Sequence, residues 1–292
     1  MAIGAFCLSL SFVFGCGERQ PEPTPARTAP TRVSTPATPA RIAPAPIESS
    51  TVPPQETITV MTYNILKGAG ADAVAPGNKE WAAQLGFPGN RLPTVLEVIR
   101  TADPDILGIQ EANQWNLGSP PVARRVADQL GMDYFLSVST NPESGFASVV
   151  LFTKFDIKEA ESYSSHFSRA ALRAELVTPA GKSIHVFVVH LDGASDHVRE
   201  AESAFLVGEM QAYVDDFSML IGDMNFLDRP TSIGAILRQA GWSHPLGPSQ
   251  NIDQIWTSSV LQPHVQPAPD IPSELTSRAS DHRPVAVEIG IP

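Results

Sequence analysis

The sequence has very little cysteine, and this excludes several kinds of site. Its two cysteines, Cys7 and Cys16, both lie within the first 16 residues of a 292-residue chain. The rest of the protein therefore has no disulfide and no thiolate metal site. The sequence also lacks the P-loop, the G-x-G-x-x-G fingerprint and the G-x-S-x-G nucleophile elbow. Phosphate binding by a glycine-rich loop and acyl transfer by a motif serine are therefore disfavoured.

Basic residues are scarce relative to acidic ones. The chain has 20 Lys and Arg against 31 Asp and Glu, a net charge of −11, and no run of Lys or Arg stands out. A protein that binds polyanions through bulk electrostatics needs the opposite balance. The hydrophobic share of 42% is ordinary for a chain with a packed core. We therefore expect an acidic globular protein.

The first residues have the composition of an export signal. "MAIGAFCLSLSFVFGCG" is an apolar run too short to span a bilayer, and it is typical of the h-region of a signal peptide. Its "VFGC" ending resembles the lipobox of bacterial lipoproteins, in which the cysteine is acylated. We therefore expect residues 1–16 to direct export, with lipidation at Cys16 and attachment to the membrane of the cell envelope. A plain cleaved signal, giving a secreted protein, is the alternative.

Residues 17–55 have the composition of a linker. Pro, Thr, Ala and Ser dominate this segment, and no apolar periodicity is present. Such a stretch cannot bury enough apolar surface to offset the entropy lost on ordering. We expect it to be disordered and extended, and to connect the N-terminus to a folded domain at 56–292.

The remaining sequence alternates strand-like and helix-like segments, without an internal repeat. Period-2 and continuous apolar runs predict strands at 57–64, 105–111, 147–154, 169–178, 181–190, 217–225, 254–259 and 284–290. Helical spacing, with Pro and Gly as terminators, predicts helices at 91–104, 121–131, 196–214 and 231–241. This alternation indicates an α/β architecture.

Polar side chains stand at the ends of the predicted strands. One group follows an apolar run, at the carboxyl end of its strand: Asn64, Glu111, His190, Asp223 and Asn225. A second group precedes an apolar run, at the amino end of its strand: Asp253, Asp281 and His282. Sites of α/β proteins form at carboxyl strand ends, and antiparallel neighbours place the amino end of one strand beside the carboxyl end of the next. We therefore expect both groups to share one rim.

Acids, amides and imidazoles in this combination suit a hard divalent cation. Because no thiol is present, the expected ion is Mg²⁺, with Mn²⁺ or Ca²⁺ as alternatives. Further carboxylates remain to orient water or an imidazole, and histidines transfer protons near neutral pH. This combination of side chains predicts metal-assisted hydrolysis of a phosphate ester.

Six short motifs, in a fixed order, resemble one family. They are "MTYN", "GIQE", "VVHLD", "GDMN", "NIDQIW" and "SDHRPV", and they span nearly the whole predicted domain. Each is weak alone, but the ordered set resembles the endonuclease/exonuclease/phosphatase superfamily, which has a DNase-I-like fold. The resemblance implies a four-layer α/β sandwich of two packed mixed β-sheets flanked by helices. It also implies cleavage of phosphodiesters or phosphomonoesters.

The resemblance implies roles for the metal-facing and water-facing residues. Glu111 matches the main metal ligand of the family, with Asn64 close by and Asp281 as a further metal or histidine-proximal acid. Asp223 and Asn225 match the pair that positions or deprotonates the attacking water and holds phosphate. Asn64 and Asn225 are thus also expected to contact substrate.

Two histidines complete the implied set. His282 matches the histidine that contacts the scissile phosphate, and Asp253 matches the acid that hydrogen-bonds to it. His190 matches the second histidine, a candidate acid for the leaving oxygen, although the division of labour between the two stays open. Arg173, inside a predicted strand, is expected to form a structural ion pair rather than to bind phosphate.

The sequence therefore predicts an exported, monomeric, Mg²⁺-dependent phosphoesterase that uses in-line attack by water. A nuclease or a sphingomyelinase-type lipid phosphodiesterase is an alternative, with nucleic acid or lipid as the substrate. The histidine of "VVHLD" disfavours the apurinic-endonuclease branch of the superfamily. A catalytically inactive binding module with the same fold is the rival from another functional class.

Overall fold

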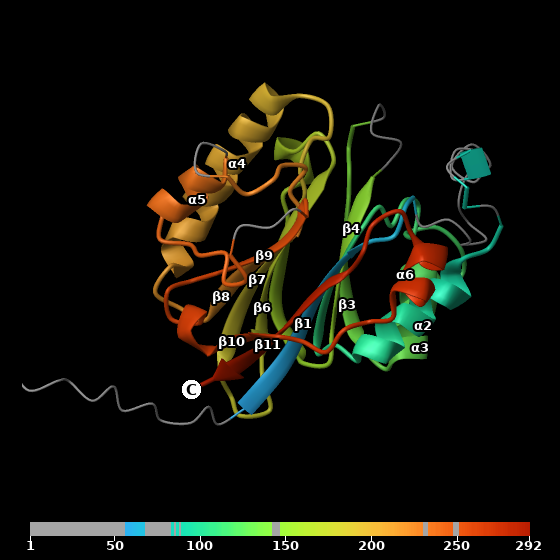
Figure 1. The fold of residues 1–292 in the computed structure, drawn as a ribbon, viewed down its shortest axis with the longest axis horizontal. Coiled ribbons are helices and arrows are strands. Elements are labelled where there is room, and N and C mark those ends of the chain that lie inside the picture. Colours follow the sequence, from blue (N-terminus) through green and yellow to red (C-terminus); the bar gives the residue numbers. More distant parts are fainter. Residues whose placement is uncertain are drawn as a thin grey trace, which may run out of the picture. The chain divides into compact units, whose positions relative to one another are not determined.

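Two β-sheets, each with parallel and antiparallel neighbours, form the folded region (Figure 1). A computed structural model of the chain describes residues 56–67, 83–84, 86–87, 89–141, 147–229, 233–247 and 251–292. The expected export segment with Cys16 and the expected linker lie outside these residues.

The described residues contribute six strands to the first sheet and five to the second. The first sheet has the order β10-β11-β1-β2-β4-β3 and consists of β1 (Glu56–Asn64), β2 (Ile106–Gln110), β3 (Asp133–Val138), β4 (Ser148–Thr153), β10 (Val265–Pro267) and β11 (Val285–Ile291). The second has the order β5-β6-β7-β8-β9 and consists of β5 (Asp156–Ser162), β6 (Ala170–Val177), β7 (Ser183–His190), β8 (Ser218–Asp223) and β9 (Asp253–Thr257).

Helices cover the outer face of each sheet (Figure 1). They are α2 (Leu92–Ala102), α3 (Val122–Leu130) and α6 (Ser273–Ala279) on the first sheet, and α4 (Asp196–Met210) and α5 (Gly234–Gln239) on the second. Short 3-10 turns occur at η2 (Ser164–His166), η3 (Gln211–Tyr213) and η4 (Gln262–His264). The layers are therefore helices, sheet, sheet and helices, which confirms the predicted four-layer sandwich of two mixed sheets.

The inner faces of the two sheets pack against each other through one aliphatic core. Ile58 and Val60 of β1 join Val186 and Val188 of β7 in this core, and all four are at most 1% exposed. Because side chains alternate along a strand, the intervening residues face the helices instead, as Met61 does. Each of these strands is thus buried on both faces, one against the other sheet and one against helices. This explains why the motif-bearing strands are near-continuous apolar runs.

Every predicted strand and helix has a counterpart in the structure, and most of the predicted ends agree with the observed ones within about three residues. The ion pair expected for Arg173 is also present, since Nη2 of Arg173 lies 2.9 Å from Oε2 of Glu159 on the neighbouring strand. The structure adds β3, β5, β10 and α6, which the sequence patterns do not predict. Among the described residues, no helix combines the length and the apolar character required to cross a bilayer.

Candidate active site

Polar side chains line one end of the space between the two sheets. The side chains of Ile58 and Val60 on β1 face the other sheet, and apolar residues of the other strands face inward in the same way. The same alternation places predicted site residues at the inward-facing ends of their strands: Asn64, His190, Asp223 and Asp253. All four are 1% exposed. The site therefore begins where the inter-sheet core ends.

Strand pairing brings these ends to one rim, as predicted. His190 and Asp223 are partners on parallel strands, and Asp223 is opposite Asp253 on antiparallel strands. In the other sheet, the amino end of β11 pairs with the carboxyl end of β1, since Val285 is opposite Thr62. Amino and carboxyl strand ends thus meet at one edge, which is the arrangement expected for mixed sheets.

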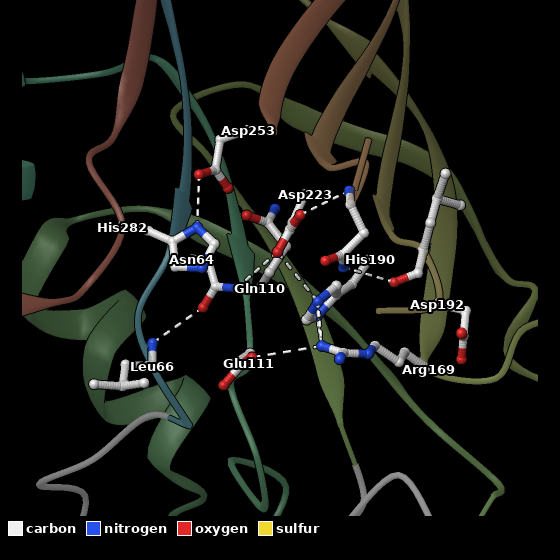
Figure 2. A network of polar contacts seen from close by, with 12 residues as sticks. Asn64, Leu66, Gln110, Glu111, Arg169, His190, Asp192, Asp223, Asp253 and His282 are labelled. Atoms are coloured by element: carbon white, nitrogen blue, oxygen red, sulfur yellow. Dashed lines mark hydrogen bonds and ion pairs between the residues drawn. The ribbon is translucent and has the colours of Figure 1, made fainter. Parts of the chain in front are cut away.

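Asp223 is the central group of this rim (Figure 2). Its Oδ2 accepts a hydrogen bond of 3.0 Å from Nδ2 of Asn64 and lies 3.3 Å from Nε2 of His190. Its Oδ1 accepts the backbone N–H of Asn225 at 2.9 Å. Burial by itself raises the pKa of this carboxyl, but the charges of His190 and His282 and the bond from Asn64 outweigh it and hold the pKa at about 2. Asp223 is therefore an ionised acceptor at neutral pH.

The glycine of "GDMN" fixes the approach of β8 to β7. Gly222 has φ 151°, and a Cβ added there would lie 2.0 Å from the carbonyl oxygen of Val189. Only glycine fits such a close contact between backbones. After the strand, Asn225 has φ 52°, and its Nδ2 donates to the carbonyl oxygen of Leu191 at 2.9 Å. Its side chain thus fastens the end of β8 to the end of β7.

Asp253 and His282 form a hydrogen-bonded pair beside Asp223. Nδ1 of His282 lies 2.7 Å from Oδ2 of Asp253. Burial lowers the pKa of His282, but Asp253 and the nearby carboxylates outweigh that effect and raise the pKa to about 9. Burial raises the pKa of Asp253 to about 6, against the opposing effect of the imidazole. At neutral pH the pair is therefore a carboxylate and an imidazolium, and the acid fixes the orientation of the ring.

Glu111 lies on the other side of the rim together with Arg169 (Figure 2). Glu111 has φ 60°, and its Oε2 accepts the backbone N–H of Lys67 at 2.7 Å. Its Oε1 lies 3.5 Å from Nη1 of Arg169, which also contacts Nε2 of His190. Burial raises the pKa of Glu111, but the charges of His190, Lys67 and Arg169 outweigh it, and the net shift is downward. Positive φ in a buried non-glycine residue is typical of functional sites.

Asp281 stands at the same rim but is exposed, unlike the other predicted acids. Its Oδ1 lies 3.3 Å from Oγ of Ser280, and that hydroxyl donates to the carbonyl oxygen of Asn64 at 2.8 Å. Burial lowers the pKa of Arg91, whereas the charges of Asp281 and Glu111 both act to raise it. The bond from Ser280 holds the Asp281 segment at the end of β1, and the next residues of the chain lead to Lys67, whose N–H bonds to Glu111.

Arg169 is the site residue that the sequence interpretation missed. It immediately precedes the apolar run of β6, as Asp253 and His282 precede theirs. The rule that selected those two residues also selects Arg169. Its guanidinium supplies a positive charge beside Glu111 and His190, and guanidinium groups are well suited to binding phosphate oxygens.

The donor set fits a divalent cation. Single ligand atoms of Asp223, Asp253 and His282 all lie within 4.8 Å of one another. Oδ1 of Asp253 is buried and, among the described residues, has no hydrogen-bond partner. A buried carboxylate oxygen without a partner is costly unless a cation or water satisfies it. The carboxylate oxygens of this group suit Mg²⁺, Mn²⁺ or Ca²⁺, whereas the charged ring of His282 is not a metal ligand.

Comparison with known families identifies the chain. Residues 61–282 match the Endonuclease/Exonuclease/phosphatase family, a span that includes every predicted site residue from Asn64 to His282. The chain belongs to this family. Among curated proteins, no sequence matches it.

Several solved structures are similar to this chain in fold. The human Nocturnin catalytic domain, with a bound sulfate anion, is 18% identical and has a TM-score of 0.55, covering 80% of this chain and 94% of that one. A mannosyl-6-phosphatase from Bacteroides thetaiotaomicron is 18% identical with a TM-score of 0.54, covering 80% and 99%. A functionally unknown conserved protein from Enterococcus faecalis is 17% identical with a TM-score of 0.59, covering 80% and 100%. At these identities the likeness concerns the fold.

The endonuclease/exonuclease/phosphatase family consists of metal-dependent phosphoesterases, and this member has a fitting acidic cluster at its rim. A phosphate-ester substrate follows from the family.

Proposed function

We propose that the protein is a Mg²⁺-dependent phosphoesterase that hydrolyses a small phosphate ester by in-line attack of water. The observation that carries the proposal is the bonding of Asp223. This ionised carboxylate contacts Asn64 from one sheet and His190 from its own, with the Asp253–His282 pair beside it. Such a cluster of buried acids and imidazoles at one rim suits proton transfer and phosphate binding.

Three residues are proposed to hold the cation. Glu111 provides the principal carboxylate, with Asn64 and Asp281 as the further ligands, and the group that includes Asp223 and Asp253 offers a second oxygen-rich position. When bound, a divalent cation supplies positive charge that stabilises the phosphate in the transition state. Mg²⁺ is proposed because few protein carboxylates suffice for it and it readily accepts phosphate oxygens.

The protein groups then divide the remaining work. Asp223, with Asn225 fastened behind it, orients the attacking water and accepts its proton as the oxygen bonds to phosphorus. The imidazolium of His282 donates a hydrogen bond to a phosphate oxygen. The leaving alcohol takes a proton from His190 or His282, with the choice between them left to experiment. Arg169 binds a second phosphate oxygen.

The charge of the chain favours a small ester over a nucleic acid. A net charge of −11 without a basic run disfavours binding along a polyanion. One protein of the same fold is a mannosyl-6-phosphatase, which supports this choice.

A substrate panel tests the function. We expect the purified chain to hydrolyse p-nitrophenyl phosphate or bis-p-nitrophenyl phosphate with Mg²⁺, and EDTA to remove this activity, because the cation supplies the charge that stabilises the transition state. Inositol phosphates, sphingomyelin and plasmid DNA in parallel reactions separate the small-ester, lipid and nuclease alternatives. No turnover on any of them with Mg²⁺, Mn²⁺ or Ca²⁺ would reject the proposed function and favour the inactive binding module.

We also propose that the protein is exported and lipid-anchored in a bacterial cell envelope, on the basis of the apolar leader and its "VFGC" sequence. Cells expressing the chain are expected to incorporate a labelled fatty acid into it, and Cys16→Ala should abolish the label, because the thiol is the acylated atom. Cys7→Ala is the matched control. Unlabelled wild-type protein in the culture medium would instead indicate a cleaved signal.

A further inference from the structure

A buried carboxylate behind the site connects the two segments that carry Arg169 and His190. Glu202 belongs to α4 and is 2% exposed. Its Oε1 accepts the backbone N–H of Ser168 at 2.7 Å, and its Oε2 accepts the backbone N–H of Asp192 at 2.8 Å. Both oxygens of one buried acid are therefore used on two backbone positions far apart in sequence.

Those two positions flank a direct contact in the site. Ser168 immediately precedes Arg169, and Asp192 follows His190 by two residues. Nη1 of Arg169 contacts Nε2 of His190. This arginine nitrogen also lies 3.5 Å from Oε1 of Glu111. The Glu202 carboxylate thus fixes the backbone on both sides of the arginine–histidine contact without touching either side chain.

Gly193 borders the space that the guanidinium of Arg169 occupies. A Cβ added to Gly193 would lie 2.5 Å from Nη2 of Arg169 and 3.5 Å from Oδ1 of Asn225. The contact of 2.5 Å is far below any van der Waals distance, so the guanidinium fills the place that a side chain would take. Because the displaced atom is the end of a long side chain, a methyl group at this position moves the guanidinium rather than the backbone.

We propose that Glu202 and Gly193 are positioning residues that hold the Arg169 guanidinium against an anionic oxygen of the substrate phosphate. This inference rests on the proposed phosphoesterase function. A long arginine side chain loses much rotamer freedom when it is ordered, and prior fixation of its backbone and of one wall reduces that loss on binding. Rigid support of this kind is what places a binding group within the narrow tolerance that catalysis requires.

Gly193→Ala is the sharpest test. We expect it to lower kcat/KM on bis-p-nitrophenyl phosphate with Mg²⁺ by up to about 10²-fold, the cost of a displacement near 1 Å. It should also weaken the binding of inorganic phosphate, measured by isothermal titration calorimetry, while the melting temperature stays unchanged. Gly208→Ala on α4 is the matched control, since its Cβ would meet nothing within 4 Å.

The arginine itself provides the internal reference. In an Arg169→Ala background, Gly193→Ala should cause no further loss of phosphate binding, and added guanidinium ion should restore part of the activity of Arg169→Ala. Glu202→Gln, which replaces one acceptor oxygen by a donor facing a backbone N–H, is expected to weaken phosphate binding like Gly193→Ala and also to lower the melting temperature. Exposed Glu200→Gln is its control.

Two outcomes would overturn the inference. One is phosphate binding by Gly193→Ala equal to that of wild type; the other is an equal loss from Gly193→Ala with and without Arg169. The phosphate titrations need no turnover, so they decide the inference even if the wild type fails to hydrolyse the whole panel, which is the result that rejects the proposed function.

Discussion

Asp223→Ala is expected to lower kcat by roughly 10³- to 10⁴-fold, the range of a lost general acid or base with its positioning effect. The carboxylate bonds to Asn64 across the gap between the sheets and lies beside His190, so its removal leaves two groups without their common partner. Steady-state kinetics with Mg²⁺ on the best ester of the panel measure the effect.

Two further variants separate charge from shape at this position. Asp223→Asn keeps the size and one acceptor oxygen but removes the negative charge, and it should lose nearly as much activity as the alanine variant. Asp215→Ala, at an exposed aspartate, should leave kcat unchanged. If Asp223→Asn retained wild-type turnover, the carboxylate would have no part in the chemistry.

His282→Ala is expected to lower kcat/KM by about 10²- to 10⁴-fold, and Asp253→Ala should cause a loss of similar size. The acid is bonded to the ring at 2.7 Å and, together with neighbouring carboxylates, raises the pKa of His282 to about 9, which keeps the ring charged at neutral pH. Without Asp253, burial favours the neutral imidazole, and the hydrogen bond to phosphate loses its charge.

A double-mutant cycle shows whether the two residues act as a unit. The double variant should be little worse than His282→Ala alone, because Asp253 acts through the ring. Losses that simply multiplied would show that the acid has an independent role, such as binding the cation through its second oxygen. The melting temperatures of all three variants provide the control for folding.

The sequence predicts the motif-bearing strands well because each of them carries an apolar stripe toward the other sheet. Asn64, Asp223 and Asp253 interrupt that stripe at its end, and this makes them visible in the sequence. The common rim also follows from pattern alone, once the first and last strands are taken as antiparallel. No local pattern, in contrast, indicates that Asp281 is exposed while its neighbour His282 is half-buried.

The missed strands and helix have physical reasons. β5 is an edge strand with exposed charged residues such as Glu159, and it lacks the apolar alternation by which a strand is recognised. β10 has three residues and ends in Pro267, and α6 has only seven residues. Their positions depend on pairing with β11 and on packing against α2, which are long-range contacts.

Glu202 illustrates a different limit. An acid within an amphipathic helix normally faces solvent, so nothing in the sequence around Glu202 distinguishes it from exposed Glu200. Its burial arises only because the loops after β7 and before β6 meet over α4. Its partners Ser168 and Asp192 lie 34 and 10 positions away, and such contacts leave no periodic trace in the sequence.

The hydrogen bond from Asn64 to Asp223 has a mechanical consequence. Each sheet holds itself together through its own backbone ladder, whereas at the rim this bond, like that between His282 and Asp253, bridges two separately hydrogen-bonded halves through side chains. A slippage of one half past the other severs these bridges while both ladders survive intact. We therefore expect the activity to be lost before the secondary structure when the protein is exposed to heat or denaturant, because the activity depends on contact between the two sheets.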